Sequence, residues 1–345
     1  MLGMVVWWVK LARGGTVLHI ISARNVNHAL QEGMWHLATC GHAAESRNGS
    51  VVVAPGPVLT TYHFPMERVL FNQHRDANPF FHLMEALWML AGRNDLAFVQ
   101  RFVQRMANYS DDGVHLQGAY GHRWRRQFSL DQLHALITLL KRAPDTRRAV
   151  LQMWSAEIDL SAALQDGKDV PCNTHAYLEL KAGALCMTLL CRSNDAVWGA
   201  HGANAVQFSM LLEYLAAAIG AEVGRLQQFS NNYHAYCDWY APEELKNLYA
   251  ADDRYTTAVD IAPYPLVSVP IEVWDTDLMR FMSDPMGDTK YEDQFFHAVA
   301  APMFSSWDCY KRGEVSNSLC AAQAIAAADW RTACIEWIQR RNAPL

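Results

Sequence analysis

The sequence has few of the patterns that mark metal-binding or membrane-spanning proteins. None of its eight cysteines forms a Cys-X-X-Cys pair, so neither a zinc motif nor a redox disulfide finds support. We therefore expect no metal, reduced thiols and a cytoplasmic location. The apolar start, residues 1–15, is interrupted by Lys10 and Arg13. It is too short to span a bilayer and lacks a cleavage site, so we interpret it as a strand or a loose extension.

A basic excess is also absent. The chain carries 29 Lys and Arg against 35 Asp and Glu, a net charge of −6. Proteins that coat nucleic acid or anionic membranes carry a basic excess, so we expect neither as a direct partner. Any phosphate that this protein binds should meet a local arginine cluster.

Hydrophobic residues make up 51% of the chain, enough for a large core. Helical spacing and apolar runs predict helices at 25–41, 78–92, 95–109, 130–144 and 204–220, and over most of the tail from about 290. Strand patterns fall at 50–64, 148–154, 175–183 and 184–193, the last two as a hairpin turned at Ala182-Gly183.

We find no internal repeat and no low-complexity linker. A single large α+β domain, with a mixed or antiparallel sheet packed by helices, is the simplest architecture. It should cover 1–263, with 1–18 as an extension in front, and a mainly helical extension should cover 264–345. Trp330, Ile335 and Trp337 at helical spacing predict that this extension packs on the domain.

Cys172 is the most informative cysteine. It follows Pro171 at the edge of a predicted strand, and Arg192 falls in the same hairpin region. A guanidinium nearby would stabilise the thiolate and activate it as a nucleophile. A random cysteine is far more often a packed thiol, so its context must decide.

Arginine sites suited to phosphate are Arg47, the adjacent pair Arg147 and Arg148, and Arg192 followed by Ser193. Each alone is more often a surface ion pair. Two adjacent arginines at the start of a strand project to opposite faces, which is unusual.

Other candidates are a carboxylate and three ring residues. Glu85 in a hydrophobic helix should have a raised pKa, unless backbone or aromatic donors satisfy it. Tyr120 lies in a glycine-flanked turn, where a phenol can approach a ligand closely. His234 and Tyr236 alternate on one face of an extended segment, so both could reach one sugar hydroxyl.

Eight segments in order resemble the thymidylate synthase family. They are "SRNGS" with Arg47, "MEALWMLAG" with Glu85, "GAYGHRW", "DTRRAVLQMW", "PCN", "CRSNDAVWG", Asn204 and "YHAY". The match runs from about residue 27 to about residue 250. Each motif alone is weak, but their common order and spacing make the resemblance specific. It implies a thymidylate synthase-like fold.

The resemblance implies roles for the reacting groups. In that family a cysteine adds to C6 of a bound pyrimidine deoxynucleotide, and C5 then attacks the methylene of 5,10-methylenetetrahydrofolate. Cys172 matches this nucleophile. Glu85 matches a buried glutamate that organises waters and moves protons at O4 and the folate. Tyr120 matches the tyrosine associated with removing the C5 proton, and Asp195 the aspartate that binds the pterin.

It also implies a nucleotide-binding set. The matching positions are Arg47, Arg192 and Ser193 for the phosphate, Asn204 for the N3 and O4 edge, and His234 and Tyr236 for the sugar 3′-hydroxyl. Arg147 and Arg148 match a pair that the partner subunit donates to the phosphate. The resemblance thus implies a homodimer with shared active sites, which binds a pyrimidine deoxynucleotide monophosphate and folate.

Several positions depart from the family pattern. Asn173 stands where synthases usually carry a histidine, and "WGAHGANAV" lacks the usual Pro-Phe pair and needs one inserted residue to place Asn204. "FVQRMANYSDDG" replaces a tryptophan-rich segment, and a helical tail replaces the C-terminus that normally closes over folate. The departures fall on the pterin and hydride-transfer side, where synthases exclude water. A pocket that admits water would yield a 5-hydroxymethyl nucleotide, as in the hydroxymethylases that some viruses use to make modified DNA.

The sequence therefore favours a phage-type dUMP hydroxymethylase, in the host cytoplasm if it is viral. The Asn204 amide both donates and accepts, which fits uracil, whereas cytosine-specific relatives use an aspartate there. Three alternatives stay open: a thymidylate synthase that makes dTMP and dihydrofolate, a dCMP hydroxymethylase, and a catalytically silent nucleotide-binding subunit. The joint presence of Cys172, Glu85, Tyr120 and Asp195 argues against the silent subunit.

Overall fold

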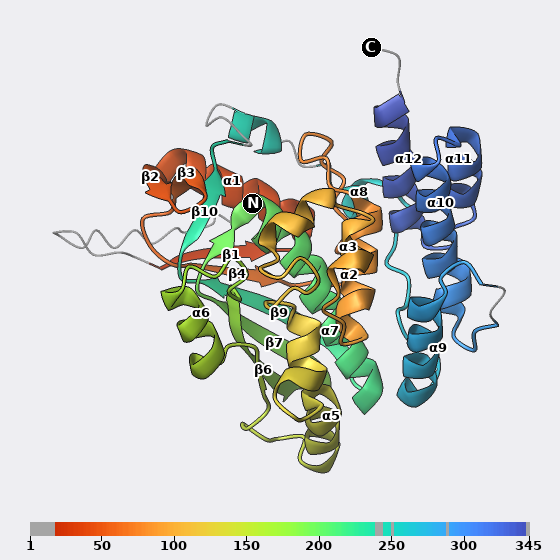
Figure 1. Cartoon of the computed structure of the whole chain (residues 1–345), viewed down its shortest axis with the longest axis horizontal. Helices are drawn as coiled ribbons and strands as arrows, with labels where there is room; N and C mark the ends of the chain where they lie inside the picture. Colours follow the sequence, from red (N-terminus) through yellow and green to blue (C-terminus); the bar gives the residue numbers. More distant parts are fainter. Residues whose placement is uncertain (1–17, 239–243, 250–251, 288–289, 343–345) are drawn as a thin grey trace, which may run out of the picture.

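A mixed six-stranded sheet, in the order β1-β4-β9-β7-β6-β5, organises the fold (Figure 1). The computed structural model describes residues 18–238, 244–249, 252–287 and 290–342. The strands of this sheet are β1 (His19–Ala23), β4 (Val58–Tyr62), β5 (Val150–Gln152), β6 (Asn173–Lys181), β7 (Ala184–Cys191) and β9 (Glu222–Ser230). β1 with β4 and β7 with β9 pair in parallel, and the other neighbours are antiparallel. The predicted α+β class and mixed sheet are confirmed.

A four-stranded sheet, in the order β2-β3-β10-β8, lies beside it. Its strands are β2 (His42–Ser46), β3 (Gly49–Val53), β8 (Asn194–Asp195) and β10 (Tyr233–Tyr236). The predicted extended run 50–64 thus divides between two sheets, because β3 belongs to this one and β4 to the larger one. The small sheet places the β2–β3 turn next to β10.

The predicted hairpin is present as β6 and β7. Ala182 and Gly183 at its turn have φ values of 50° and 84°. Positive φ at both central residues is typical of the tight two-residue turns that match the twist of paired strands. This hairpin fixes the position of the segment that precedes β6.

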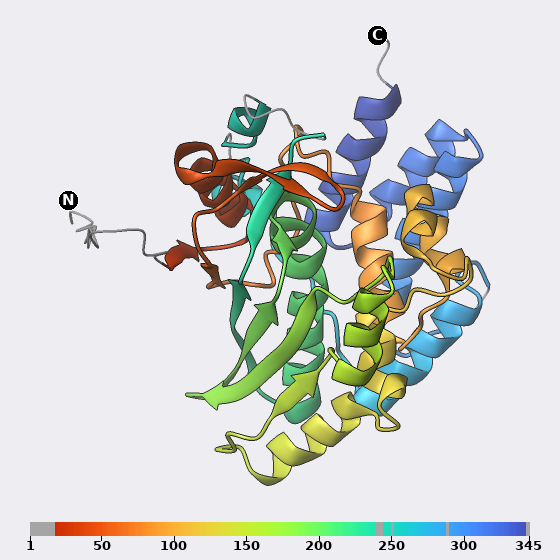
Figure 2. The same cartoon turned by 60° about the vertical axis from the view of Figure 1, so that its left-hand side comes forward.

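Helices gather on one face of the six-stranded sheet, and in Figure 2 no helix of the described chain covers the opposite face. Those on the covered side include α1 (Val26–Cys40), α2 (Pro79–Leu90), α5 (Gln132–Arg142) and α7 (Asn204–Ile219), all close to predicted spans. Shorter segments are α4 (Tyr120–His122), η2 (Arg123–Gln127), η3 (Ala156–Leu160), α6 (Ser161–Leu164), η4 (Ala196–Ala203), η5 (Glu244–Tyr249) and α8 (Arg254–Thr257). None of the helices within the described ranges is long and apolar enough to cross a bilayer.

One predicted helix was wrong in detail, and one strand was not predicted. The single helix expected at 95–109 is divided into α3 (Leu96–Gln100) and η1 (Gln104–Tyr109), because Val103 is extended with a φ of −137°. The break lets Phe102 pack on Phe304 and Trp307 of the C-terminal helices. The strand β9 was not predicted, because polar residues occupy its buried face.

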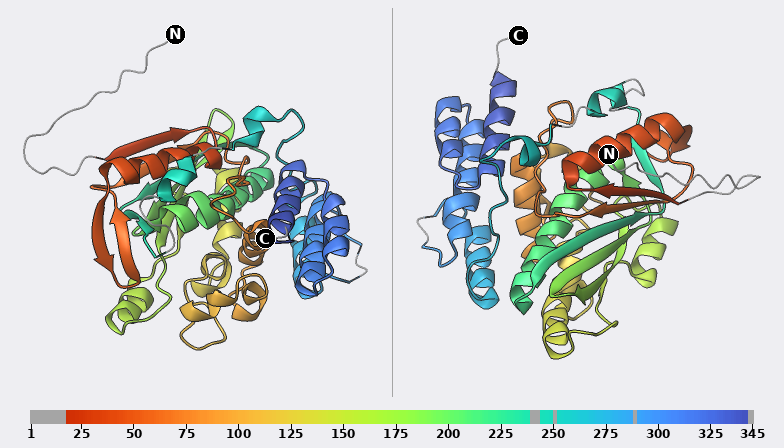
Figure 3. Two further views of the ribbon diagram at one scale, coloured as in Figure 1. Left: turned by 90° about the horizontal axis from the view of Figure 1, so that it is seen from above. Right: turned by 180° about the vertical axis from the view of Figure 1, so that it is seen from behind.

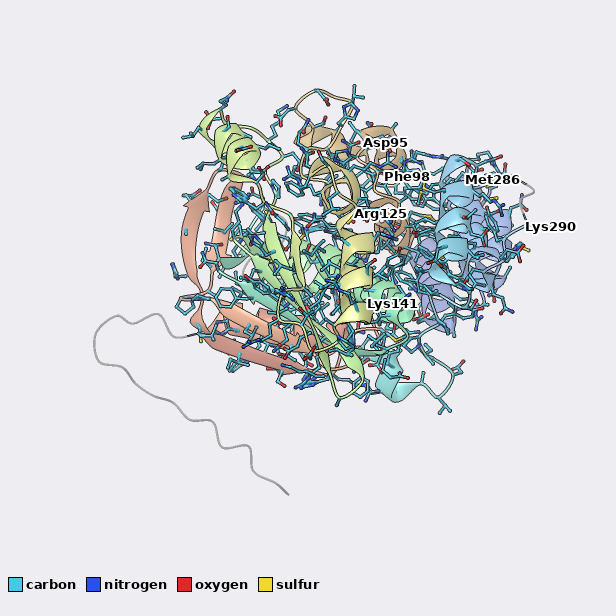
Figure 4. The ribbon with its side chains drawn as sticks, turned by 90° about the horizontal axis from the view of Figure 1, so that it is seen from below. Asp95, Phe98, Arg125, Lys141, Met286 and Lys290 are labelled. Atoms are coloured by element: carbon cyan, nitrogen blue, oxygen red, sulfur yellow. The ribbon has the colours of Figure 1, made fainter. Side chains whose placement is uncertain are left out.

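The C-terminal residues form helices α9 (Ile271–Ser283), α10 (Ala301–Lys311), α11 (Val315–Gln323) and α12 (Ala328–Asn342), with η6 (Phe296–Ala300) before α10. They stand together beside α2 and α3 (Figure 3). Phe80 of α2 packs on Trp307 and Trp337, with ring centroids 5.5 and 5.7 Å apart. Arg125, labelled in Figure 4, donates to Asp275 of α9 at 3.1 Å. The extension therefore packs on α2, while the domain boundary at 263 stays a prediction and residues 1–17 lie outside the described chain.

Candidate active site

Four of the predicted site residues meet at one cavity of about 240 Å³. Glu85, Tyr120, Cys172 and Asn204 line it, although they come from α2, α4, the segment before β6 and α7. A larger hollow of about 460 Å³ lies between residues 71–74 and α12, and no predicted site residue lines it. We therefore place the candidate active site at the smaller cavity.

Arg192 holds the segment that carries Cys172. Nε and Nη2 of Arg192 donate to the carbonyl oxygens of Pro171 and Val170, each at 2.8 Å. Burial raises the pKa of the Cys172 thiol, and the charges of Arg192 and Arg47 lower it only in part. Arg192 does lower the pKa of the thiol, as predicted, but desolvation raises that pKa by more.

Tyr120 supports the same segment. Its phenolic oxygen accepts hydrogen bonds from the backbone N–H groups of Cys172 and Asn173, at 3.3 and 3.1 Å. Gly121 packs so closely on α2 that a Cβ there would lie 1.9 Å from the carbonyl oxygen of Met89. Glycine is thus needed for the close approach. Burial raises the pKa of Tyr120, so the phenol keeps a proton that it can donate into the cavity.

A chain of side-chain amides orients Asn204. Asn173 donates from Nδ2 to Oδ1 of Asn204 at 3.0 Å, and Asn204 donates from Nδ2 to Oδ1 of Asn194 at 3.0 Å. The ends are fixed because Cys191 donates to Asn173, and Asn194 donates to Ser230 at 2.9 Å. Asn204 therefore keeps one N–H and one oxygen lone pair for a ligand. Asn173 is fully buried and does not line the cavity, so any effect on a ligand passes through Asn204.

Glu85 is held by Gln207, which sequence reasoning missed. Nε2 of Gln207 donates to Oε2 of Glu85 at 2.6 Å. Burial raises the pKa of Glu85 to about 7, although this hydrogen bond lowers it. A carboxyl with that pKa both gives and takes protons near neutrality. Gln207 lies one helical turn after Asn204, and this spacing was the signal available in the sequence.

Asp195 carries an acceptor without a partner among the described residues, but it does not line the cavity. Its Oδ1 accepts from the backbone N–H groups of Val197 and Trp198 at 2.7 and 2.8 Å. Oδ2 is buried and has no hydrogen-bond partner in the described part of the chain. Burial raises the pKa of Asp195, although the hydrogen bonds from these N–H groups lower it. A buried acceptor without a partner suits an N–H donor of a ligand, such as a pterin ring carries.

Arg47 lies in the turn between β2 and β3, against the loop that leads to Cys172. Nη1 and Nη2 donate to the carbonyl oxygens of Gly167 and Lys168, at 2.9 and 3.3 Å. The next residue, Asn48, donates to the Tyr236 hydroxyl at 3.5 Å. Arg47, the 167–168 loop and β10 are therefore neighbours at one end of the site.

His234 and Tyr236 stand together on β10. Their ring centroids are 5.1 Å apart in an edge-to-face arrangement. Nδ1 of His234 lies 2.8 Å from Oδ1 of Asn232. Burial lowers the pKa of His234, so its ring is neutral and both donates and accepts. Neither residue lines the cavity, and neither does the half-buried Ser193.

Arg147 and Arg148 do not reach the cavity of their own chain. Both are exposed just before β5, at the edge of the uncovered face of the large sheet. A pair so placed is free to contact a second copy of the chain. The predicted cross-subunit role stays a prediction.

A second residue that sequence reasoning missed is Asp169. It lines the same cavity as Cys172, three residues before it. Among the described residues, no group of three or more His, Cys, Asp or Glu side chains is placed to hold a metal ion. All eight cysteines are free thiols.

Comparison with known proteins agrees with this geometry. The thymidylate synthase family model matches residues 32–264. A deoxyuridylate hydroxymethyltransferase of Pseudomonas phage M6 is 46% identical over 94% of this chain and 95% of its own. A protein of the same name from Bacillus phage SP01 is 37% identical over 57% of this chain and 54% of its own. A putative thymidylate synthase of Methanosarcina acetivorans is 27% identical over 66% of this chain and 94% of its own. The chain belongs to the thymidylate synthase family.

Proposed function

We propose that this protein transfers a one-carbon unit to C5 of dUMP and completes the reaction with water, giving 5-hydroxymethyl-dUMP. The observation that carries the proposal is the similarity to a phage deoxyuridylate hydroxymethyltransferase over nearly the whole of both chains. Polar side chains in the cavity at Cys172 support it, because Glu85 and Gln207 line the space and can bind a water there. Oε1 of Gln207 is a buried acceptor without a partner among the described residues.

Asn204 supports uracil as the base. Its free N–H can donate to O4, and its free lone pair can accept from N3–H. The amide chain from Asn173 holds it in this orientation. Cytosine presents an acceptor at N3 and an amino group at C4, the reverse pattern, so the same amide would meet it in the wrong orientation.

Cys172 supplies the nucleophile. Its sulfur adds to C6 of the pyrimidine, and its pKa, raised by burial, makes proton removal part of this step. Arg192 and Arg47 lower that pKa and are the cations nearest to a bound phosphate in our assignment. Glu85, with a pKa of about 7, exchanges protons at the O4 side, and the Tyr120 phenol serves the C5 side.

The residues present fit a folate. Oδ2 of Asp195 is the buried acceptor that would take an N–H of the pterin. When bound, methylenetetrahydrofolate supplies the one-carbon unit for C5. No described residue after Gln207 lines the cavity, so the C-terminal helices do not close over it.

We also propose a homodimer in the host cytoplasm whose product serves modified DNA. The uncovered face of the six-stranded sheet carries exposed apolar side chains, Ile20 at 61%, Tyr177 at 46% and Val150 at 40%. Arg147 and Arg148 flank this face, as a pair shared across a symmetric interface would.

Mass spectrometry of the nucleotide product tests the proposal. Supplied separately with methylenetetrahydrofolate, dUMP should give a hydroxymethyl nucleotide without dihydrofolate, and dCMP should give little product. A methyl product with matching dihydrofolate would instead identify a thymidylate synthase. No turnover with either nucleotide, while dUMP still binds, would identify a silent binding subunit.

A further inference from the structure

Asp169 is a carboxylate in the active-site cavity to which the family resemblance gives no role. It lines the cavity together with Glu85, Cys172 and Asn204. Its Oδ2 accepts a hydrogen bond from the backbone N–H of Gly118 at 2.8 Å. The carboxylate is therefore held in place on the segment that carries the nucleophile.

The position of Asp169 works against the first chemical step. Its negative charge raises the pKa of the Cys172 thiol, and a carboxylate there disfavours the thiolate. Arg192 and Arg47 oppose this effect. A group that hinders nucleophile formation in the same cavity is explained best by a contribution to another step.

The surroundings of Asp169 make it a better base than an exposed carboxylate. Burial raises its pKa, the Gly118 N–H and the charge of Arg123 lower it, and Asp111 and Asp159 raise it. Arg123 is itself paired with Asp159 at 2.7 Å in a buried ion pair, so its charge is largely committed there. A carboxylate whose pKa lies closer to the working pH accepts a proton more readily.

Glu85 and Asp169 occupy different walls of the cavity. Glu85 projects from α2 and is bound by Gln207 of α7, whereas Asp169 is fixed by Gly118 on the Cys172 side. Two carboxyl groups in separate environments can serve separate proton transfers.

We propose that Asp169 is the general base that activates the water in the final step. This inference rests on the proposed function. The water oxygen bonds to the exocyclic methylene carbon on C5, while one water proton passes to the Asp169 carboxylate. The electrons of the methylene double bond move toward O4, then re-form the C5–C6 double bond and expel the Cys172 sulfur as a thiolate. The proton on Asp169 is released to solvent, and no redox partner is required.

An added thiol separates this step from the earlier ones. A thiol competes with water for the same methylene carbon and gives a thioether nucleotide, which needs Cys172 and one-carbon transfer but no water activation. In Asp169→Asn, which keeps an acceptor for Gly118, hydroxymethyl-dUMP formation should fall about a hundredfold. The ratio of thioether to hydroxymethyl product should rise by a similar factor, and the dissociation constant for dUMP should stay within about twofold.

Two matched variants serve as controls. Asp166→Asn changes an exposed acid in the same loop and should leave the product ratio unchanged. Glu85→Gln should lower both products together, because the addition of thiol and the addition of water both send electrons toward O4, where Glu85 exchanges protons.

The outcomes distinguish the inference from the proposed function. An unchanged product ratio in Asp169→Asn, or an equal fall of both products, overturns the role of Asp169 while wild type still hydroxymethylates dUMP. A methylated product from the wild-type protein contradicts the proposed function itself.

Discussion

Asn173 donates its side-chain amide to Oδ1 of Asn204 across 3.0 Å. The family pattern has a histidine at position 173, and here the amide in its place begins a relay that ends at Ser230 of β9. Each member is oriented by the next, so the orientation of the Asn204 amide is set by residues that do not line the cavity. In our proposal, base specificity is therefore a property of this chain of amides.

Asn204→Asp tests the reading of the base. The carboxylate loses the donor to Asn194 and the donor to O4, so kcat/KM for dUMP should fall about a hundredfold. The preference for dCMP over dUMP should rise, because a protonated acid or a carboxylate suits the amino group and N3 of cytosine. Steady-state kinetics with both nucleotides give the result. Unchanged values for both would remove Asn204 from the site.

Gln207→Leu tests whether Gln207 lowers the pKa of Glu85. The hydrogen bond from Gln207 lowers the pKa of Glu85, so its loss should move that pKa above its present value of about 7. The transition in kcat that reports Glu85 should shift to higher pH by about one unit. A pH profile of kcat that is superimposable on wild type would show that the two side chains are not coupled during turnover.

Glu85→Gln tests the burial of the carboxyl through stability. The pKa of Glu85 rises from 4.5 in the unfolded chain to about 7 in the folded protein. Its contribution to stability is therefore complete below pH 4.5 and is lost as pH rises through about 7, at a cost of about 3 kcal/mol. A glutamine at this position does not ionise, so the stability of the variant does not fall in this pH range.

The variant should consequently gain stability over wild type as pH rises from about 5 to about 8. Urea unfolding of both proteins at the two pH values measures the difference. A stability difference that is the same at both pH values would mean that Glu85 is not desolvated.

Mixed dimers test the exposed arginines. Arg147→Ala and Cys172→Ser should each be poorly active alone, but a mixture should recover up to about a quarter of wild-type activity, because one composite site in each heterodimer is intact. Lys141→Ala, which removes an exposed cation at the end of α5, should be active without mixing and serves as the control. Failure of every mixing ratio to restore activity would exclude a shared site.

The sequence predicted the helices and strands in which apolar residues are the buried ones. α7 extends from Asn204 to Ile219 with mostly apolar residues and ends at Gly220, whose φ of 71° is the left-handed conformation that favours glycine at a helix end. β9 escaped prediction because its buried face carries Gln228 and Ser230, which bind the Asn194 amide instead of packing in an apolar core. A strand is recognised by apolar residues that alternate with polar ones, and buried polar side chains remove this alternation.

Some residues of the candidate site could be predicted from the sequence, and others could not. Cys172, Glu85 and Tyr120 carry motifs, so the sequence indicated them before any geometry was known. Gln207 and Asp169 carry none, and only the folded structure shows that they line the same cavity as the nucleophile. The pKa of Cys172 is raised because the thiol is buried, and the sequence, which shows only the neighbouring arginines, could not predict that burial.

Isotopic labelling tests the central claim most directly. The protein should be incubated with dUMP and methylenetetrahydrofolate in heavy-oxygen water, and the nucleotide product analysed by mass spectrometry. We predict that one heavy oxygen atom enters the new hydroxymethyl group and that no dihydrofolate accumulates. A methyl group without label, formed together with dihydrofolate, would contradict water capture and identify hydride transfer instead.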